Sequence, residues 1–216
     1  MGATFPGWSE RASDFYVGLE ADNSKDYWTR NRAVYDTEVL APMQALLDDL
    51  SAEFGEGRIF RPNRDIRFSA DKSPYKTSIG AMLGQGYVEF SARGLGTGAG
   101  CHMLAPDQLT RLRAAVADDA TGPRLEAIIG DLEAAGIDVT SHDRLATAPR
   151  GYAKDHPRIE LLRNKDLVAR KHWDPSTPWL RSPETVDHVV AVLRAARPLV
   201  QWLDENVGQT TREGRR

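Results

Sequence analysis

Apolar residues recur at helical spacing through the N-terminal part of the chain. Ser9 precedes a stretch with four apolar residues on one helical face, and serine is a favoured helix N-cap. Asn23 precedes a second such stretch, which we expect it to cap, and Asp26 adds a charge that suits a helix N-terminus. Pro42 interrupts the pattern, so we expect a kink or a new helix there before the pattern ends at Gly55.

The middle of the chain changes to short apolar runs separated by glycines, which predict strands of antiparallel hairpins. The runs cover residues 58–61, 66–68, 79–83, 87–91 and 95–104. Over residues 94–100 four glycines alternate with other residues, but no Gly-Lys-Ser/Thr follows, as a phosphate-binding loop would require. We therefore interpret these glycines as bulges or as places where another backbone approaches closely.

Helical patterns return in the C-terminal half. They begin at Pro106 and over 123–135, and a closing pattern from Ser182 is expected to bend at Pro198. Residues 137–140 are typical of a short strand, whereas 144–180 indicate irregular chain with one short helix near 158–162. The order of helices, strands and helices predicts an α+β fold, a small antiparallel sheet packed by flanking helices. We expect one domain over 1–208 and a flexible tail over 209–216.

Charge is unevenly distributed along the chain. The 216 residues carry a net charge of -3, but residues 58–76 hold six basic and two acidic side chains, a local charge of +4. Residues 144–171 hold eight basic and three acidic side chains, or +5, so the remainder carries -12. We expect the two basic segments to converge on one positive face.

The composition limits the cell compartments and the kinds of partner that we expect for this protein. No apolar run is long enough to cross a membrane, so we expect no membrane partner. The single cysteine, Cys101, cannot form an internal disulfide or a cysteine-built metal site. The first residues lack the regions of a secretory signal, so we expect a cytoplasmic location.

Three sequence segments together resemble one known family. Residues 64–76 read RDIRFS-x-DKSPYK, residues 23–28 read NSKDYW, and residues 149–157 and 161–165 read PRGY-x-x-DHP and LLRNK. The chain resembles the domain-of-unknown-function 2461 family, found in bacteria and fungi, from Trp8 to Gly208. The resemblance implies a shared fold, and no catalytic residue or cofactor is carried over from it.

The basic segments contain the candidate ligand-binding residues. Guanidinium and ammonium groups bind phosphate and carboxylate oxygens, so the leading hypothesis is recognition of a small anionic, phosphate-bearing ligand, with hydrolase or transferase activity left open. The candidates are Arg64, Arg67, Lys72, Tyr75, Lys76, Arg150 and Tyr152. The cations beside Asp65 and Asp71 should lower the pKa of both carboxyls, which favours structural ion pairs within the loop.

Acid–base candidates are few. Asp155 could orient His156, which can titrate near neutral pH, and Tyr75 after Pro74 could present its hydroxyl or simply pack its ring. The other four histidines show no metal-ligand spacing, so no metal site is predicted.

Two other functions compete with small-ligand binding. Basic residues interleaved with aromatic ones favour a nucleic-acid contact, but a pI near 6.0 argues against a dedicated nucleic-acid binder. A non-enzymatic adaptor with a structural Arg/Asp loop is the third class. The cofactor and the oligomeric state are left open.

Overall fold

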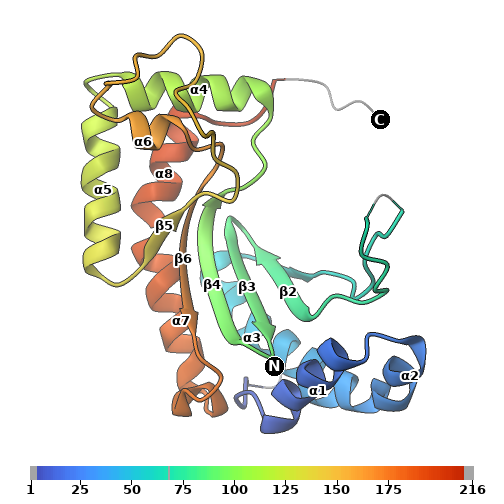
Figure 1. Ribbon diagram of the computed structural model, residues 1–216. Helices are drawn as coiled ribbons and strands as arrows, with labels where there is room; N and C mark the ends of the chain where they lie inside the picture. The colour runs from blue at the N-terminus through green and yellow to red at the C-terminus, as the bar shows by residue number, and fades with distance from the viewer. Residues whose placement is uncertain (1–3, 68, 212–216) are drawn as a thin grey trace. The chain divides into compact units, whose positions relative to one another are not determined.

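The structure is a computed structural model that describes residues 4–67 and 69–211 (Figure 1). Along the chain the helices and strands are α1 Glu10–Ala21, α2 Lys25–Val34, the π-helix η1 Tyr35–Leu40, α3 Ala41–Phe54, β1 Gly57–Ile59, β2 Ser78–Leu83, β3 Gly86–Ser91, β4 Gly94–Cys101, α4 Pro106–Ala117, α5 Gly122–Ala134, β5 Asp138–Thr140, α6 Ile159–Leu162, β6 Leu167–Trp173, the 3₁₀ helix η2 Pro178–Arg181, α7 Glu184–Ala195 and α8 Arg197–Asn206. Phe68 and residues 212–216 of the predicted tail lie outside the described residues. Among the described residues, no helix combines the length and the apolar character that crossing a bilayer requires.

Six strands form one open antiparallel sheet in the order β1-β2-β3-β4-β6-β5. In its register Arg58 of β1 pairs with Met82 of β2, and Thr140 of β5 pairs with Val168 of β6. An antiparallel sheet flanked by helices confirms the predicted α+β class.

Contacts divide the chain into two compact units. Unit 1 comprises the residues up to Thr97 together with His172–Ala191, and unit 2 comprises Gly98–Lys171 together with the residues from Val192 onward. The expectation of one domain over 1–208 stays a prediction.

Unit 1 has an aromatic core beneath its N-terminal helices. Trp8 stacks on Phe90 of β3, with ring centroids 4.1 Å apart and planes 9° apart. Ser9 caps α1 as predicted, since its Oγ accepts a hydrogen bond from the Ala12 N–H at 3.3 Å. The apolar face of α1, which includes Tyr16, is buried as the periodicity predicts.

A π-helix precedes Pro42, and the new helix expected there, α3, begins at Ala41 with Pro42 in its first turn. Proline has no N–H and its ring would collide with the carbonyl of Glu38 in an α-helix. The wider turn of η1 relieves that conflict, and the Ala41 N–H bonds the Asp36 carbonyl, five residues back. Tyr35 and Val39 face the core along this turn, and α3 then continues the apolar stripe.

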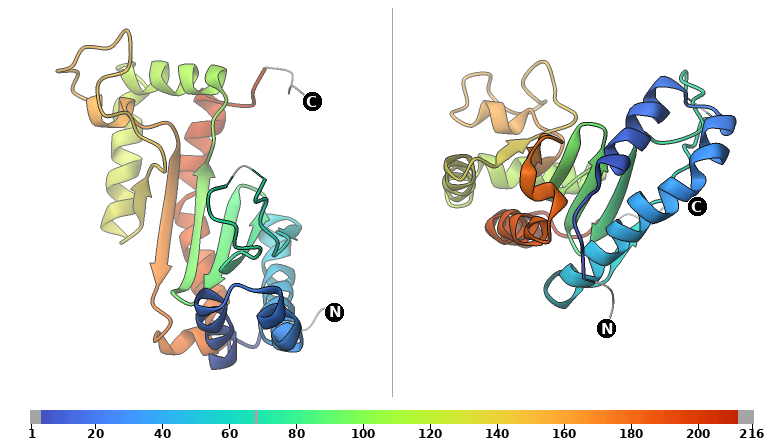
Figure 2. Two further views of the ribbon diagram at one scale, coloured as in Figure 1. Left: turned by 45° about the vertical axis from the view of Figure 1, so that its right-hand side comes forward. Right: turned by 90° about the horizontal axis from the view of Figure 1, so that it is seen from below.

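Two strand predictions in the middle and later parts of the chain are wrong. Residues 66–67 lie in a long loop between β1 and β2, which Figure 2 shows as an excursion without helix or strand. Residues 144–180 were expected to be irregular apart from one helix, but they contain β6 as well as α6. Strand β6 reads LVARKHW, three apolar residues followed by three basic ones, so it lacks the apolar–polar alternation that indicates a half-buried strand.

Glycines in β4 allow close backbone approach, as interpreted from the sequence. A Cβ at Gly98 would collide with the Ala169 carbonyl oxygen, and one at Gly100 with the Leu167 carbonyl oxygen. Strand β6 therefore lies tightly against β4.

A buried arginine in unit 2 joins the end of α4 to the start of α6. Arg158, only 6% exposed, donates hydrogen bonds to the carbonyls of Val116 at 2.6 Å and Ala117 at 2.9 Å, where α4 ends. Its guanidinium also pairs with Asp119 at 2.7 Å. A cation at a helix C-terminus satisfies carbonyls that have no partner within the helix and complements the helix dipole.

We expect Arg158→Ala to lower the free energy of unfolding by about 2–4 kcal/mol, because buried carbonyls lose a charged donor. The matched control is Arg170→Ala, an exposed arginine of β6, which should cost about 0.5 kcal/mol or less. Urea denaturation of the two variants measures the difference, and equal losses would contradict this account of Arg158.

Candidate functional site

The loop between β1 and β2, residues 61–77, is called the basic loop here and belongs to unit 1. Its two ends run antiparallel as a neck, since the Arg64 N–H bonds the Pro74 carbonyl at 2.9 Å and the Lys76 N–H bonds the Pro62 carbonyl at 2.8 Å. Asn63 and Tyr75 form an isolated β-bridge between these bonds. The motif that carries the family resemblance is therefore a closed loop on a hydrogen-bonded base.

Asn23 fastens this neck to the start of α2. Its amide nitrogen donates to the Tyr75 carbonyl at 3.1 Å, and its amide oxygen accepts from the Tyr75 N–H at 3.0 Å. The prediction that Asn23 caps α2 is wrong, because Ser24 is the N-cap and accepts from the Tyr27 N–H at 3.1 Å. The Asn23 side chain bonds the Tyr75 backbone instead of the N-terminus of α2. Its amide has one donor group and one acceptor group, as a peptide unit does, so it pairs with the N–H and the carbonyl of Tyr75 together.

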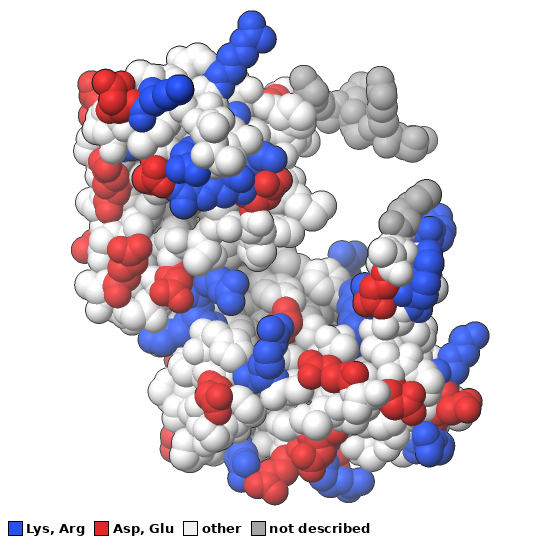
Figure 3. Space-filling view, viewed as in Figure 1, with Lys and Arg blue, Asp and Glu red and all other residues white. Residues whose placement is uncertain are grey.

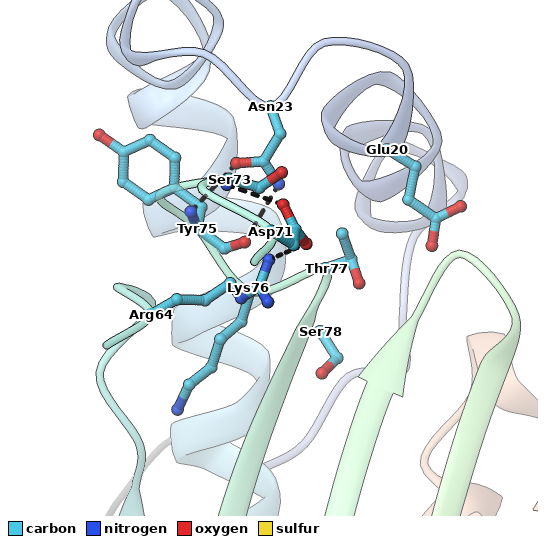
Figure 4. Close-up of a pocket in the computed structure, with 9 residues that line it drawn as sticks. All are labelled: Glu20, Asn23, Arg64, Asp71, Ser73, Tyr75, Lys76, Thr77 and Ser78. Carbon is cyan, nitrogen blue, oxygen red and sulfur yellow. Dashed lines mark hydrogen bonds and ion pairs between the residues drawn. The ribbon is translucent and has the colours of Figure 1, made fainter. Parts of the chain in front are cut away.

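Tyr75 packs its ring in the core of unit 1. The residue is 8% exposed and stacks on Trp28 of α2, with centroids 4.2 Å apart and planes 8° apart. Figure 4 shows its hydroxyl directed away from Asp71 and Lys76. The sequence left packing and catalysis open for Tyr75, and this position supports packing.

Asp71 organises the tip of the loop. Its carboxylate forms a short ion pair with Arg64 and accepts a hydrogen bond from the Ser73 N–H at 2.9 Å. The Ser73 hydroxyl and then the Arg64 guanidinium hold the pKa of Asp71 well below its ordinary value. Asp71 is therefore an ionised partner and a poor proton donor.

A second ion pair lies on the same loop. Nη2 of Arg67 lies 2.6 Å from Oδ2 of Asp65, and hydrogen bonds from Arg67 lower the pKa of Asp65. Lys72 donates to the Ile66 carbonyl at 3.0 Å. In Figure 3 acidic and basic atoms accordingly lie side by side over the loop, at the right of the view.

A pocket of about 530 Å³ opens beside the basic loop within unit 1. Its lining is polar and comes from α1, the start of α2, the loop and β2 (Figure 4): Glu20, Asn23, Arg64, Asp71, Ser73, Tyr75, Lys76, Thr77 and Ser78. Among these residues Lys76 is a cation without a carboxylate partner in the described part of the chain. Its ammonium lies 5.2 Å from the centroid of the Phe60 ring.

The candidates in the second basic segment lie in unit 2, in the turns that precede α6. Arg150 and Asp155 are exposed. The Nδ1 atom of His156 accepts a hydrogen bond from the Arg158 N–H at 3.0 Å, so neutral His156 carries its proton on Nε2. No hydrogen bond joins Asp155 to His156 among the described residues, and the contact that orients the ring at Nδ1 comes from the Arg158 backbone. That Arg150, Tyr152 and their neighbours meet the basic loop stays a prediction.

Unit 2 also brings together three side chains whose sequence spacing gave no signal. His102, His142 and Asp166 each present a ligand atom, and these atoms lie within 4.8 Å of one another. The nearest sequence indication is the position of the two histidines, since His102 lies in the predicted glycine-rich run 95–104 and His142 follows the predicted short strand 137–140. Pairing between strands, which the sequence did not predict, makes them neighbours.

Comparison with known proteins assigns the chain to a family but assigns no activity to it. A family model described as "Conserved hypothetical protein (DUF2461)" matches residues 11–202, so the chain belongs to this family. No curated protein and no solved structure matches the chain. The resemblance of the basic-loop motif is thereby confirmed as family membership.

We expect Asn23→Ala to loosen the basic loop more than the rest of unit 1. The substitution removes both hydrogen bonds to Tyr75, at a cost of about 1–2 kcal/mol. Hydrogen exchange should become faster over residues 61–77. Asn31→Ala is the control, since that amide bonds only the Tyr27 carbonyl of its own helix, and similar exchange in both variants would refute a specific role for Asn23.

Asp71 should remain ionised well below pH 3.9, the ordinary value for aspartate. A lowered pKa in the folded protein adds stability above that ordinary value, and the contribution is lost as the pH falls through the folded pKa. Ser73→Ala and Arg64→Gln should each raise the pKa of Asp71, as measured by carboxyl carbon NMR. An ordinary pKa in the unsubstituted protein would show that these contacts do not form in solution.

Proposed function

We propose that the pocket beside the basic loop binds a small phosphate-bearing anion. The observation that carries the proposal is Lys76, a pocket cation that no carboxylate neutralises among the described residues. The hydroxyl residues Thr77 and Ser78 line the same pocket. Ammonium and hydroxyl groups together are a common donor set for phosphate oxygens.

The charge of the basic loop supports this assignment only in part. Two of its five basic residues are paired with carboxylates of the loop, since Arg64 pairs with Asp71 and Arg67 with Asp65. The Arg58 guanidinium carbon lies 5.9 Å from the centroid of the Phe60 ring, against which Lys76 also lies. Cations held by a ring face keep their charge available, because the ring offers no counter-charge.

The two carboxylates of the pocket narrow the class of ligand. Glu20 and Asp71 line it together with Arg64 and Lys76. A ligand that is anionic throughout would be repelled by Glu20, whereas sugar hydroxyls or an amino group could donate to it. The proposed ligand therefore carries a phosphate at one end and hydrogen-bond donors at the other, as phosphorylated sugars and nucleotides do.

Size and aromatic exposure favour a small ligand over a nucleic acid. A volume of about 530 Å³ falls within the usual 300–1,000 Å³ of small-molecule sites. Single-strand binding needs rings on which bases stack, but Tyr75 is buried against Trp28. Phe68, a further candidate ring, lies outside the described residues.

The proposed role is recognition, and hydrolase or transferase activity finds no support in the pocket. Its lining contains no histidine or cysteine, and Asp71 is held ionised by its partners. The Ser73 hydroxyl lies beside the Asp71 carboxylate, but the lowered pKa of that carboxyl makes it a weak base for activating a nucleophile. The cytoplasmic location stays a prediction.

We expect Lys76→Gln to weaken binding of a phosphate-bearing ligand by about tenfold or more, because a hydrogen bond to a charged group is lost. Isothermal titration with inorganic phosphate, a sugar phosphate and a nucleoside monophosphate measures this. The control is Lys25→Gln, which makes the same charge change on exposed α2 outside the pocket. Equal weakening by both variants would mean that only the net charge matters.

Salt dependence separates the alternatives. A nucleic acid that contacts several phosphates loses affinity steeply as salt rises, whereas a single small anion shows a shallow dependence. Submicromolar oligonucleotide binding near physiological salt, abolished in Arg64→Ala, would replace the small-ligand proposal. Absence of binding to every anion tested would favour the adaptor function.

A further inference from the structure

The strands β4, β6 and β5 are neighbours in the sheet, and the residues just beyond one end of each lie side by side in unit 2. The β5–β6 register pairs Thr140 with Val168, and its continuation by two residues in each strand sets His142 opposite Asp166. On the other side of β6, Gly100 lies against Leu167 and Val168. His102 lies one residue beyond the end of β4, and its Nε2 is 3.9 Å from Oδ2 of the same aspartate. The antiparallel order β4-β6-β5 thus places Asp166 between two imidazoles.

The two carboxylate oxygens of Asp166 have different surroundings. Oδ1 accepts hydrogen bonds from the Ser141 hydroxyl at 2.5 Å and from the His142 N–H at 2.8 Å. Oδ2 faces Nδ1 of His142 at 3.3 Å and Nε2 of His102 at 3.9 Å, and it accepts no hydrogen bond from the described residues. One oxygen is fixed by the loop, and the other points at two nitrogen ligands.

We propose that His102, His142 and Asp166 bind one divalent transition-metal ion such as Zn²⁺. Ligand atoms about 2.1 Å from a tetrahedral ion lie about 3.4 Å apart. The distances of 3.3 and 3.9 Å from Oδ2 bracket that value, and all three ligand atoms lie within 4.8 Å of one another, so shifts of the side chains would complete the site. Imidazole nitrogen with one carboxylate suits zinc, iron or cobalt, whereas magnesium and calcium prefer oxygen ligands throughout.

Burial indicates a site with open coordination positions. The Asp166 side chain is only 4% exposed, whereas those of His102 and His142 are 51% and 48% exposed. An ion held by these three atoms would therefore face solvent on its remaining side. Structural zinc sites are closed by four protein ligands, whereas sites that bind water or substrate keep three.

The surrounding contacts orient the carboxylate as they do in known metal sites. Ser141 and the His142 backbone fix Asp166, and a further bond from the Lys165 N–H to the Asp143 carbonyl, at 2.9 Å, holds the two chain segments together. Carboxylate ligands that accept such hydrogen bonds are held in position before the ion arrives. Both segments lie in unit 2, so the site needs no residue of unit 1.

The test uses the full chain, stripped of metal with EDTA and titrated with cobalt(II) chloride. We expect one Co²⁺ per chain, with the strong visible absorption of four- or five-coordinate cobalt, displaced by Zn²⁺ and unaffected by excess Mg²⁺. Absorption no stronger than that of aqueous cobalt, or saturation only at several ions per chain, would overturn the proposal. A near-ultraviolet thiolate-to-cobalt band would also overturn it, because Cys101 would then be a ligand.

Single variants assign the ligands. His102→Gln and His142→Gln should each weaken cobalt binding by at least about tenfold, since each removes one of three metal bonds. The matched control, His172→Gln, alters an exposed histidine of unit 1 and should leave binding unchanged. Unchanged affinity in the first two variants, or equal loss in the control, would refute the assignment.

Asp166→Asn should also weaken cobalt binding, but this residue is buried and its substitution also removes structural hydrogen bonds. Both imidazoles are half exposed, so the histidine variants should keep the circular dichroism of the unsubstituted protein. The two histidine variants therefore decide the proposal whatever Asp166→Asn does.

Discussion

The pair of hydrogen bonds between the Asn23 amide and the Tyr75 backbone is the contact on which the basic loop depends. A long loop has no ladder of its own, and its buried peptide groups must find partners elsewhere. Asn23 meets that requirement at the neck, and Asp71 meets it at the tip through the Ser73 N–H. Polar residues of the motif thus provide hydrogen-bond partners for the backbone, and the polar groups that are not used in this way are available to line the pocket.

The same constraint acts in unit 2, where strands and helices stop. Arg158 satisfies the carbonyls at the end of α4, and Asp166 binds the Ser141 hydroxyl and the His142 N–H beyond the end of β5. The two oxygens of the Asp166 carboxylate have different roles. Oδ1 accepts the hydrogen bonds from Ser141 and His142, and Oδ2 faces the two imidazoles. A structural role and a metal-binding role are therefore compatible in one residue.

Local signals predicted much of the fold, and contacts between distant segments could not be predicted. Ser9 at the start of α1 and Pro106 at the start of α4 are predicted correctly, because helix starts depend on a few neighbouring residues. Asn23 was misread because its true partner is 52 positions away. His102 and His142 were separated in sequence and joined by strand register, which depends on the whole sheet.

The π-helix ahead of Pro42 has a consequence for comparing relatives of this chain. A π-turn holds about one residue more than the α-turn it replaces, and the need for it arises from the proline ring. A relative with another residue at this place has no such collision to relieve, and it can lose one residue between Val34 and Ala41 while keeping Tyr35 and Met43 directed inward. A one-residue gap in an alignment here would mark a change of helix type rather than a deleted loop.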